Sequence, residues 1–347
     1  MNAIPTCPDC EQPPVATPSL ARRDFLRVMG VSAAAVAVGS VTPVTPLARA
    51  AKARAEKQVA TEQLIFELAG TLSSDQKGKL VQPFDKTEKN GMLSRHAMNN
   101  APVGKSVIGQ EYTAKQVELL DRIFRSIANG EEGYERLSRD GGFDNSGDFK
   151  SIGALIYGEP AQGKKFSLVF SGHHLTIRCD GNSEEGAAFG GPLYYGHSPN
   201  GYNERNVFNY QTKSVQELFA ALNEKQRTSA TLDGSPGEQA ASVKFRKPAE
   251  KIPGLSIQEL SKDQKALVEK VMRDLISPYR KEDGDEVMEI VKTNGGLEKI
   301  NLAFYRDKIP TDKQPWSFWR LEGPGFVWNF RVLPHVHTFV NISSKLA

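Results

Sequence analysis

The spacing of apolar residues predicts helices in the N-terminal part of the chain and again in its middle. Apolar positions three and four residues apart, separated by charged and amide side chains, are typical of helices that pack one face against a core. Ser73 and Ser261 each stand three residues before a glutamine, a pattern typical of a helix start. The predicted helices are 51–72, 113–137, 214–232, 256–276 and 285–292.

Short runs rich in β-branched and aromatic residues predict strands in two groups. Consecutive short strands joined by tight turns favour antiparallel pairing, with the helices segregated in the N-terminal and middle parts. The chain is therefore predicted to be α+β, and it shows no repeat at a fixed period. The predicted strands are 154–157, 166–170, 175–178, 302–305, 316–320, 326–332 and 337–342.

A Gly-, Asn- and Tyr-rich stretch from 181 to 210 interrupts the strand pattern. It predicts a long loop, and loops of this length are often functional. The run Tyr194-Tyr195-Gly196-His197 within it could line a pocket.

The first fifty residues resemble an export signal. Arg22 and Arg23 precede a Phe-Leu pair and a weakly apolar run from 28 to 41, a pattern typical of the twin-arginine route. The run is shorter than the about 20 apolar residues of a membrane span. The small-x-small sequence 48–50 predicts cleavage before Ala51, with an uncleaved membrane anchor as the alternative.

These features predict a signal peptide over 1–50 and a single α+β domain over 51–347. We expect the chain to meet the twin-arginine translocon during export and to reside in the periplasm or outside the cell. We expect no stable membrane span in the mature form.

The net charge and the cysteine content exclude some classes of function and of stabilisation. The formal net charge is +3 over 347 residues, and no basic stripe with interleaved aromatics is present, so nucleic-acid binding is not indicated. Cys7 and Cys10 precede the arginine pair, which leaves Cys179 as the only thiol after the signal. No internal disulfide can form in the mature chain, and its stability must come from packing.

Histidines in the predicted strands are the main candidates for chemistry. His335 and His337 alternate along a predicted strand, which places both imidazoles on one face about 6–7 Å apart. They can reach one ion, although histidines packed at a core edge are the alternative. His174 shares a face with polar residues, whereas His173 shares one with apolar residues. We therefore expect His174 to be a ligand and His173 to be buried or to lie behind it.

Convergence of His174, His335 and His337 would form a site with an open position, suited to zinc, copper or non-haem iron. We expect the strands that hold His174 and His337 to be neighbours in one sheet or to face each other across a cleft. His197 or Glu322 could supply a fourth group.

Two arginines of predicted strands are further candidates. Arg178 and Arg331 could each hold a carboxylate ligand through a fixed guanidinium. A solvated edge position or a structural ion pair is the alternative for both residues.

Several motifs resemble the bacterial domain-of-unknown-function family 3500. The resemblance covers most of the chain after the signal, and the Ser-Gly-His-His-Leu segment is its most specific element. It implies an exported protein and no particular activity. The motifs are 170–175, Tyr194-Tyr195-Gly196, Glu224-Lys225-Gln226-Arg227, Gly323-Pro324 and His335-Val336-His337.

Three functions remain open from these residues. The first is an exported metalloprotein with enzymatic activity on a small-molecule substrate, whose metal acts as a Lewis acid or redox centre. The second is a non-enzymatic periplasmic protein that binds a metal or a small ligand. The third is an envelope protein whose histidines are simply packed.

Overall fold

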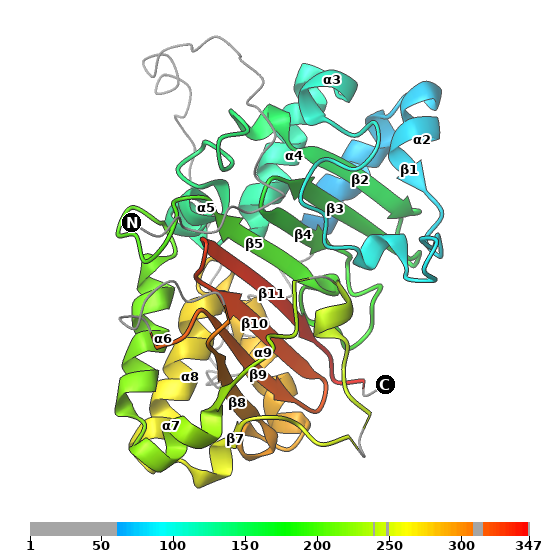
Figure 1. Cartoon of the computed structure of the whole chain (residues 1–347). Coiled ribbons are helices and arrows are strands. Elements are labelled where there is room, and N and C mark those ends of the chain that lie inside the picture. Colours follow the sequence, from blue (N-terminus) through cyan, green and yellow to red (C-terminus); the bar gives the residue numbers. More distant parts are fainter. Residues whose placement is uncertain (1–60, 239, 248–249, 308–314, 346–347) are drawn as a thin grey trace, which may run out of the picture.

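A computed structural model describes residues 61–238, 240–247, 250–307 and 315–345. The predicted signal peptide, its cleavage site and the first ten residues of the helix predicted from 51 lie outside these ranges. Figure 1 shows one continuous sheet with helices packed along it, which confirms the α+β prediction. Among the described residues, no helix combines the length and the apolar character required to cross a bilayer.

The helices follow the predicted pattern, but their bounds differ in places; the helix predicted from 256, for example, begins at Lys262. Ser73 and Ser261 cap helices through capping boxes, as predicted. The helix predicted over 113–137 is interrupted after residue 127, because the backbone of Ala128 and Asn129 pairs with Pro278 and Tyr279 instead. The helix predicted over 214–232 is also divided, since Asn223 starts a new helix. Residues 61–71 are helical, and the named helices are α2 Ser74–Leu80, α3 Ile108–Glu111, α4 Ala114–Ile127, α5 Gly130–Ser138, α6 Asn209–Ala221, α7 Glu224–Ala230, α8 Lys262–Ile276 and α9 Lys281–Thr293.

The strands form a single sheet in the order β1-β2-β3-β4-β5-β11-β10-β9-β8-β6, with β7 paired to β8. Neighbours pair antiparallel except β1 with β2 and β6 with β8, which are parallel. The strands are β1 Val81–Gln82, β2 Gly153–Gly158, β3 Phe166–Gly172, β4 Leu175–Cys179, β5 Leu193–His197, β6 Thr231–Leu232, β7 Leu255–Ser256, β8 Asn301–Tyr305, β9 Phe318–Gly323, β10 Phe326–Arg331 and β11 Val336–Ile342.

Strand β5 corrects the prediction of one long loop over 181–210. It pairs with β4 on one side and with β11 on the other, at the centre of the sheet. Its residues from Leu193 to Gly196 are buried. The surrounding glycines and prolines indicate a loop locally, but two neighbouring strands supply the hydrogen bonds that make this segment a strand.

The sheet has two halves of the same topology, which meet where β5 pairs with β11 (Figure 1). In each half a short strand pairs in parallel with the outermost of four antiparallel strands, which are β2-β3-β4-β5 in one half and β8-β9-β10-β11 in the other. Gly172 ends β3, and Gly323 ends the equivalent strand β9. A Cβ added to Gly172 would lie 2.6 Å from Ile152, and a Cβ added to Gly323 would lie 2.8 Å from Ile300. The architecture is therefore repeated, although the sequence shows no repeat at a fixed period.

Side-chain contacts repeat between the halves as well. In the first half, the side-chain amides of Gln76 and Gln116 hydrogen-bond to each other, and each also donates to a backbone carbonyl. Gln226 and Gln264 make the same set of bonds in the second half. These four glutamines fix how each pair of helices meets.

The two faces of the sheet differ in what covers them. The main core lies between the helices and one face, where Tyr195 donates its hydroxyl to the Leu275 carbonyl of α8. On the other face Tyr194 and Phe339 pack with Met98 and Phe245, which belong to irregular segments. This irregularly covered face carries the histidines described next.

Candidate metal centre

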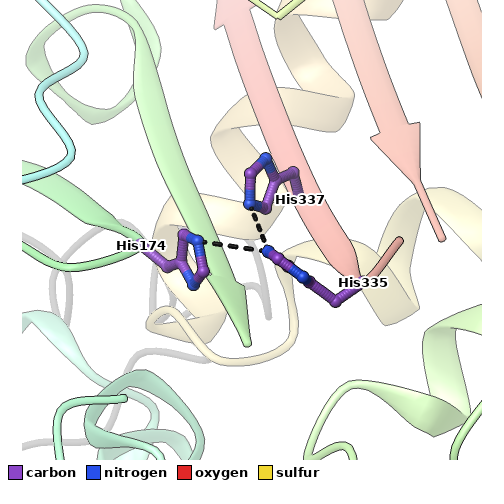
Figure 2. Close-up of side chains that lie close together, drawn as sticks. All are labelled: His174, His335 and His337. Carbon is purple, nitrogen blue, oxygen red and sulfur yellow. Dashed lines mark hydrogen bonds between the residues drawn. The ribbon is translucent and has the colours of Figure 1, made fainter. Parts of the chain in front are cut away.

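Three histidine side chains meet on the irregularly covered face (Figure 2). His335 Nε2 lies 3.3 Å from His174 Nε2 and 3.0 Å from His337 Nε2. Nitrogens bound tetrahedrally to one zinc ion at about 2.0–2.1 Å stand about 3.3 Å apart. The three side chains are at most 2% exposed. This group, called the histidine cluster below, could hold a metal ion.

His174 reaches the cluster from a turn. His173 and His174 form the two-residue connection between β3 and β4, so the alternation of faces along a strand does not apply to them. His174 has a φ of 49°, in the left-handed region that few non-glycine residues adopt. The argument that selected His174 from strand alternation was therefore wrong, although the residue does lie in the cluster.

Gly196 allows the imidazoles of His174 and His337 to meet. The expectation that their strands are neighbours is wrong, because β5 lies between β4 and β11. Gly196 of β5 is the partner of His337 across the ladder. A Cβ on Gly196 would lie 2.9 Å from His337 Cδ2 and 3.3 Å from the Cβ of His174. The missing side chain leaves room for the two rings above the strand.

Two histidines of the cluster bond Nδ1 to a side-chain oxygen, whereas His337 Nδ1 makes no hydrogen bond within the described residues and only has a carboxylate near it. His174 Nδ1 contacts a carboxylate oxygen of Asp144. His335 Nδ1 lies 3.2 Å from Asn200 Oδ1, and His337 Nδ1 lies 3.5 Å from Glu238 Oε1. An oxygen acceptor holds the proton on Nδ1 and leaves the Nε2 lone pair free to bind a metal. Sequence reasoning missed these oxygens, because they come from segments without a recognisable motif.

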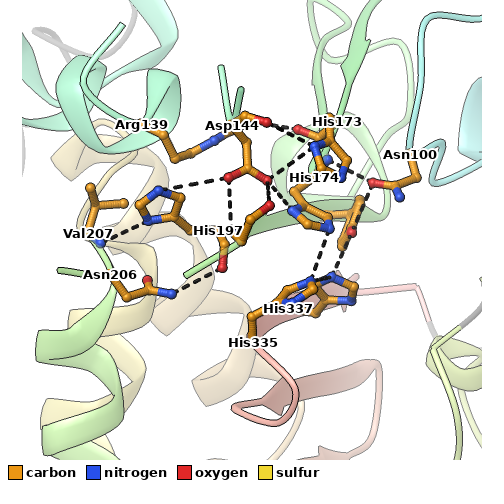
Figure 3. Close-up of polar contacts among 12 residues, drawn as sticks. Asn100, Arg139, Asp144, His173, His174, His197, Asn206, Val207, His335 and His337 are labelled. Atoms are coloured by element: carbon orange, nitrogen blue, oxygen red, sulfur yellow. Dashed lines mark hydrogen bonds and ion pairs between the residues drawn. The ribbon is translucent and has the colours of Figure 1, made fainter. Parts of the chain in front are cut away.

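Asp144 is the centre of a second polar network (Figure 3). It accepts hydrogen bonds from the Ser198 N–H at 2.9 Å and the Ser198 hydroxyl at 2.7 Å. His173 Nδ1 donates to the Asp144 carbonyl at 2.9 Å. His197 Nδ1 accepts from the Val207 N–H at 3.1 Å, which leaves the proton on Nε2, 3.8 Å from Asp144 Oδ1. Asp144, His173 and His174 are close enough to form a second group, but these hydrogen bonds account for it.

His173 and His197, both considered as ligands, therefore lie behind the cluster. His173 Nδ1 faces Asp144, and His197 turns Nδ1 to the Val207 N–H and Nε2 toward Asp144.

Burial lowers the pKa of two histidines of the cluster, His174 and His337. It lowers the pKa of His174 to about 4, although Asp144 acts in the opposite direction. Burial and then the charge of Arg331 lower the pKa of His337 well below its ordinary value. Burial alone would raise the pKa of Asp144, but its bond to His174 holds it below the usual range. These shifts favour neutral imidazoles at His174 and His337 beside an ionised Asp144, the forms that bind metal ions.

Glu322 does not reach the cluster, contrary to expectation. Glu322 lies in β9. In the same strand Phe318 pairs with Arg331 of β10, which in turn pairs with His337 of β11. Glu322 is four residues beyond Phe318, so it lies about 13 Å along the strand from the level of His337. Its carboxylate is engaged by Arg320 at 2.9 Å and by Arg246 at 2.6 Å. A buried carboxylate between two guanidinium groups is a structural ion pair here.

The two arginines differ in what they hold. Arg178 donates to the backbone carbonyls of Arg95 and Ala97, and within the described part of the chain it forms no ion pair with a carboxylate, which favours the structural alternative for this residue. Arg331 contacts a carboxylate oxygen of Glu238, the residue behind His337. The hypothesis of a guanidinium that holds a carboxylate near the site therefore fits Arg331.

Comparison with known proteins places the chain in a family. It matches the family described as "Protein of unknown function (DUF3500)" over residues 54–343, and it belongs to that family. No curated protein and no solved structure matches it. The resemblance inferred from the sequence motifs is thus confirmed, while the activity must be argued from the histidine cluster.

Proposed function

We propose that the protein is a metalloprotein in which His174, His335 and His337 bind one divalent ion through Nε2. The observation that carries this proposal is the convergence of three buried histidine nitrogens. His174 Nδ1 contacts Asp144 and His335 Nδ1 lies 3.2 Å from Asn200 Oδ1, so protons on these two nitrogens leave Nε2 lone pairs for an ion. His335 Nε2 lies 3.3 Å from His174 Nε2 and 3.0 Å from His337 Nε2. Lone pairs at this distance repel, and a cation between them removes the repulsion.

The donor set favours zinc, copper or non-haem iron, to which imidazole is suited. It contains no thiolate, the usual ligand of closed structural zinc sites. Three protein ligands leave a fourth position for water or substrate, as in catalytic sites. An ion held in this way supplies Lewis-acid or redox chemistry, so an enzyme acting on a small molecule is our preferred interpretation.

A non-enzymatic protein that binds a metal or a small ligand is the second candidate. Both carboxylates of the site, Asp144 and Glu238, lie behind imidazoles, where they balance the charge of an ion and orient its ligands. Such support serves storage as well as catalysis. Turnover by the metal-loaded protein would distinguish an enzyme from a binding protein.

The metal site is tested by elemental analysis of untagged protein purified from its own compartment. We expect about one equivalent of one transition metal per chain, and its loss in both H335A and H337A, because each removes one of only three protein ligands. H96A is the matched control, since His96 is bonded to Glu184 outside the cluster. Substoichiometric metal of every kind in the wild type, or equal loss in H96A, would end the metalloprotein interpretation.

We also propose export by the twin-arginine route, on the basis of Arg22, Arg23 and the weakly apolar run after them. Replacing both arginines by lysine should retain the protein in the cytoplasm, because lysine offers a flexible point charge and not a planar fork of donors. Fractionation of cells that express each form is the measurement. Undiminished export of the double variant would show that the pair is not recognised.

A further inference from the structure

Tyr194 places its hydroxyl at the edge of the histidine cluster. The oxygen lies 3.4 Å from His337 Nε2, close to the spacing of the three Nε2 atoms themselves. The ring is 3% exposed and stacks on Phe339 with centroids 4.6 Å apart and an interplanar angle of 16°. Its edge meets the His337 ring at 5.4 Å and 85°. The hydroxyl is thus held in place by a fixed ring.

Asn100 is a hydrogen-bond partner of this hydroxyl, in addition to the contact with His337 Nε2. Tyr194 O–H donates to Asn100 Oδ1 at 3.2 Å, and the same oxygen accepts the backbone N–H of His174 at 2.7 Å. The 3.2 Å bond is a long contact between neutral groups. A charge-assisted hydrogen bond to an anion is about twice as strong as such a neutral one. An anion beside the hydroxyl would therefore compete well with Asn100.

The charges around the cluster favour an anion as well. Asp144 and Glu238 are the carboxylates behind the histidines, but Arg331 contacts Glu238 and offsets its charge. Arg139 likewise offsets the negative charge of Asp144, and its positive charge lowers the pKa of that carboxyl. A divalent ion at the cluster would keep a net positive charge in a buried place, where charges interact strongly.

We infer that Tyr194 borders the open coordination position and hydrogen-bonds to a small anion bound there to the metal. This inference rests on the metal site proposed above. The ligand class is a small anion that binds through oxygen or nitrogen, because the histidines are at most 2% exposed and leave little room. Tyr194 is accordingly a residue that determines specificity, and the hydroxyl turns from Asn100 to the anion when it binds.

The test uses Co²⁺ as the metal and azide as the anion. The purified protein is stripped with a chelator, reconstituted with Co²⁺ and titrated with sodium azide, while the visible absorption of Co²⁺ is recorded. Y194F keeps the stacked ring and removes only the hydroxyl. We expect its azide dissociation constant to rise on the order of 10-fold, with Co²⁺ affinity unchanged within about 3-fold.

Y195F is the matched control. Tyr195 is the next residue of β5, and its buried hydroxyl bonds to the Leu275 carbonyl on the opposite face of the sheet. This variant also loses a buried phenol hydrogen bond, so it should lower the melting temperature without changing azide affinity. A purely structural role for Tyr194 predicts the same behaviour in both variants.

The outcomes separate the two proposals. No binding of Co²⁺ by the wild type would contradict the metal site itself. Co²⁺ binding with a spectrum that azide leaves unchanged would show a closed fourth position and overturn only the present inference. Equal azide affinity in wild type and Y194F would overturn it too. Loss of Co²⁺ from folded Y194F would make Tyr194 a metal ligand and overturn the inference in the form stated.

Discussion

Replacing Gly196 by alanine should disrupt both the sheet and the histidine cluster. The added Cβ would lie 2.4 Å from the Val336 carbonyl oxygen, so that oxygen must retreat by about 1 Å to regain the 3.4 Å of an ordinary contact. Val336 precedes His337 in β11, and both pair with β5. Overpacking of this kind costs about 1–3 kcal/mol of unfolding free energy.

The same movement should weaken metal binding by at least about 100-fold, because metal–ligand distances tolerate changes of only about 0.2 Å. Urea unfolding and metal stoichiometry of G196A measure the two effects. G78A is the matched control, since Gly78 is exposed in α2 and nothing lies within 4 Å of its added Cβ. Alanine there should stabilise the helix by about 0.5–1 kcal/mol and leave metal content unchanged. Wild-type stability and metal content in G196A would refute the role assigned to Gly196.

D144N should lower metal affinity about 10–100-fold in a chelator competition, because the charge that orients His174 is lost; unchanged affinity would contradict that role. The hydrogen bond from His96, followed by that from Arg95, lowers the pKa of Glu184 to about 2 from 4.5, against the effect of burial. Its stabilising contribution is therefore complete above pH 4.5 and lost as the pH falls toward 2, so the stability difference between wild type and E184Q, about 1–2 kcal/mol at pH 7, should shrink over that range. A difference independent of pH in urea unfolding would contradict this assignment. S261A should cost about 1 kcal/mol without loss of metal, since Ser261 only caps α8; equal stability in thermal melts would show that the capping box adds nothing.

Helix starts are the features that the sequence determined most directly. The side chain of Ser73 accepts from the N–H of Gln76, and that of Ser261 accepts from the N–H of Gln264. Both partners of each bond lie within one turn, so no tertiary contact is needed to specify it. The strand segments 166–170 and 326–332 were recognisable for a similar reason, since their β-branched and aromatic residues suit a sheet buried on both faces.

The central strand shows where local pattern is insufficient. Residues around Tyr194 lie among glycines and prolines, which favour a loop on any local criterion. Their strand conformation depends on β4 and β11, which are distant in sequence and are found only when the sheet forms. The equivalence of the two halves was hidden likewise, because it lies in topology and in bonds such as those of Gln116 and Gln264, not in a fixed repeat of residues.

The histidine cluster also has some features that the sequence determines and others that only the fold determines. The spacing of two residues was enough to indicate that His335 and His337 could meet, although His335 precedes β11 and the strand alternation used for the prediction does not apply to it. The position of His174 depends on a hairpin turn, on a left-handed φ and on the missing side chain of Gly196. Asp144, Asn200 and Glu238 come from three separate segments that only the folded chain brings behind the rings. The sequence by itself determined which residues could bind a metal, and tertiary structure decided which of them meet, because ligand convergence is a long-range property of the sheet.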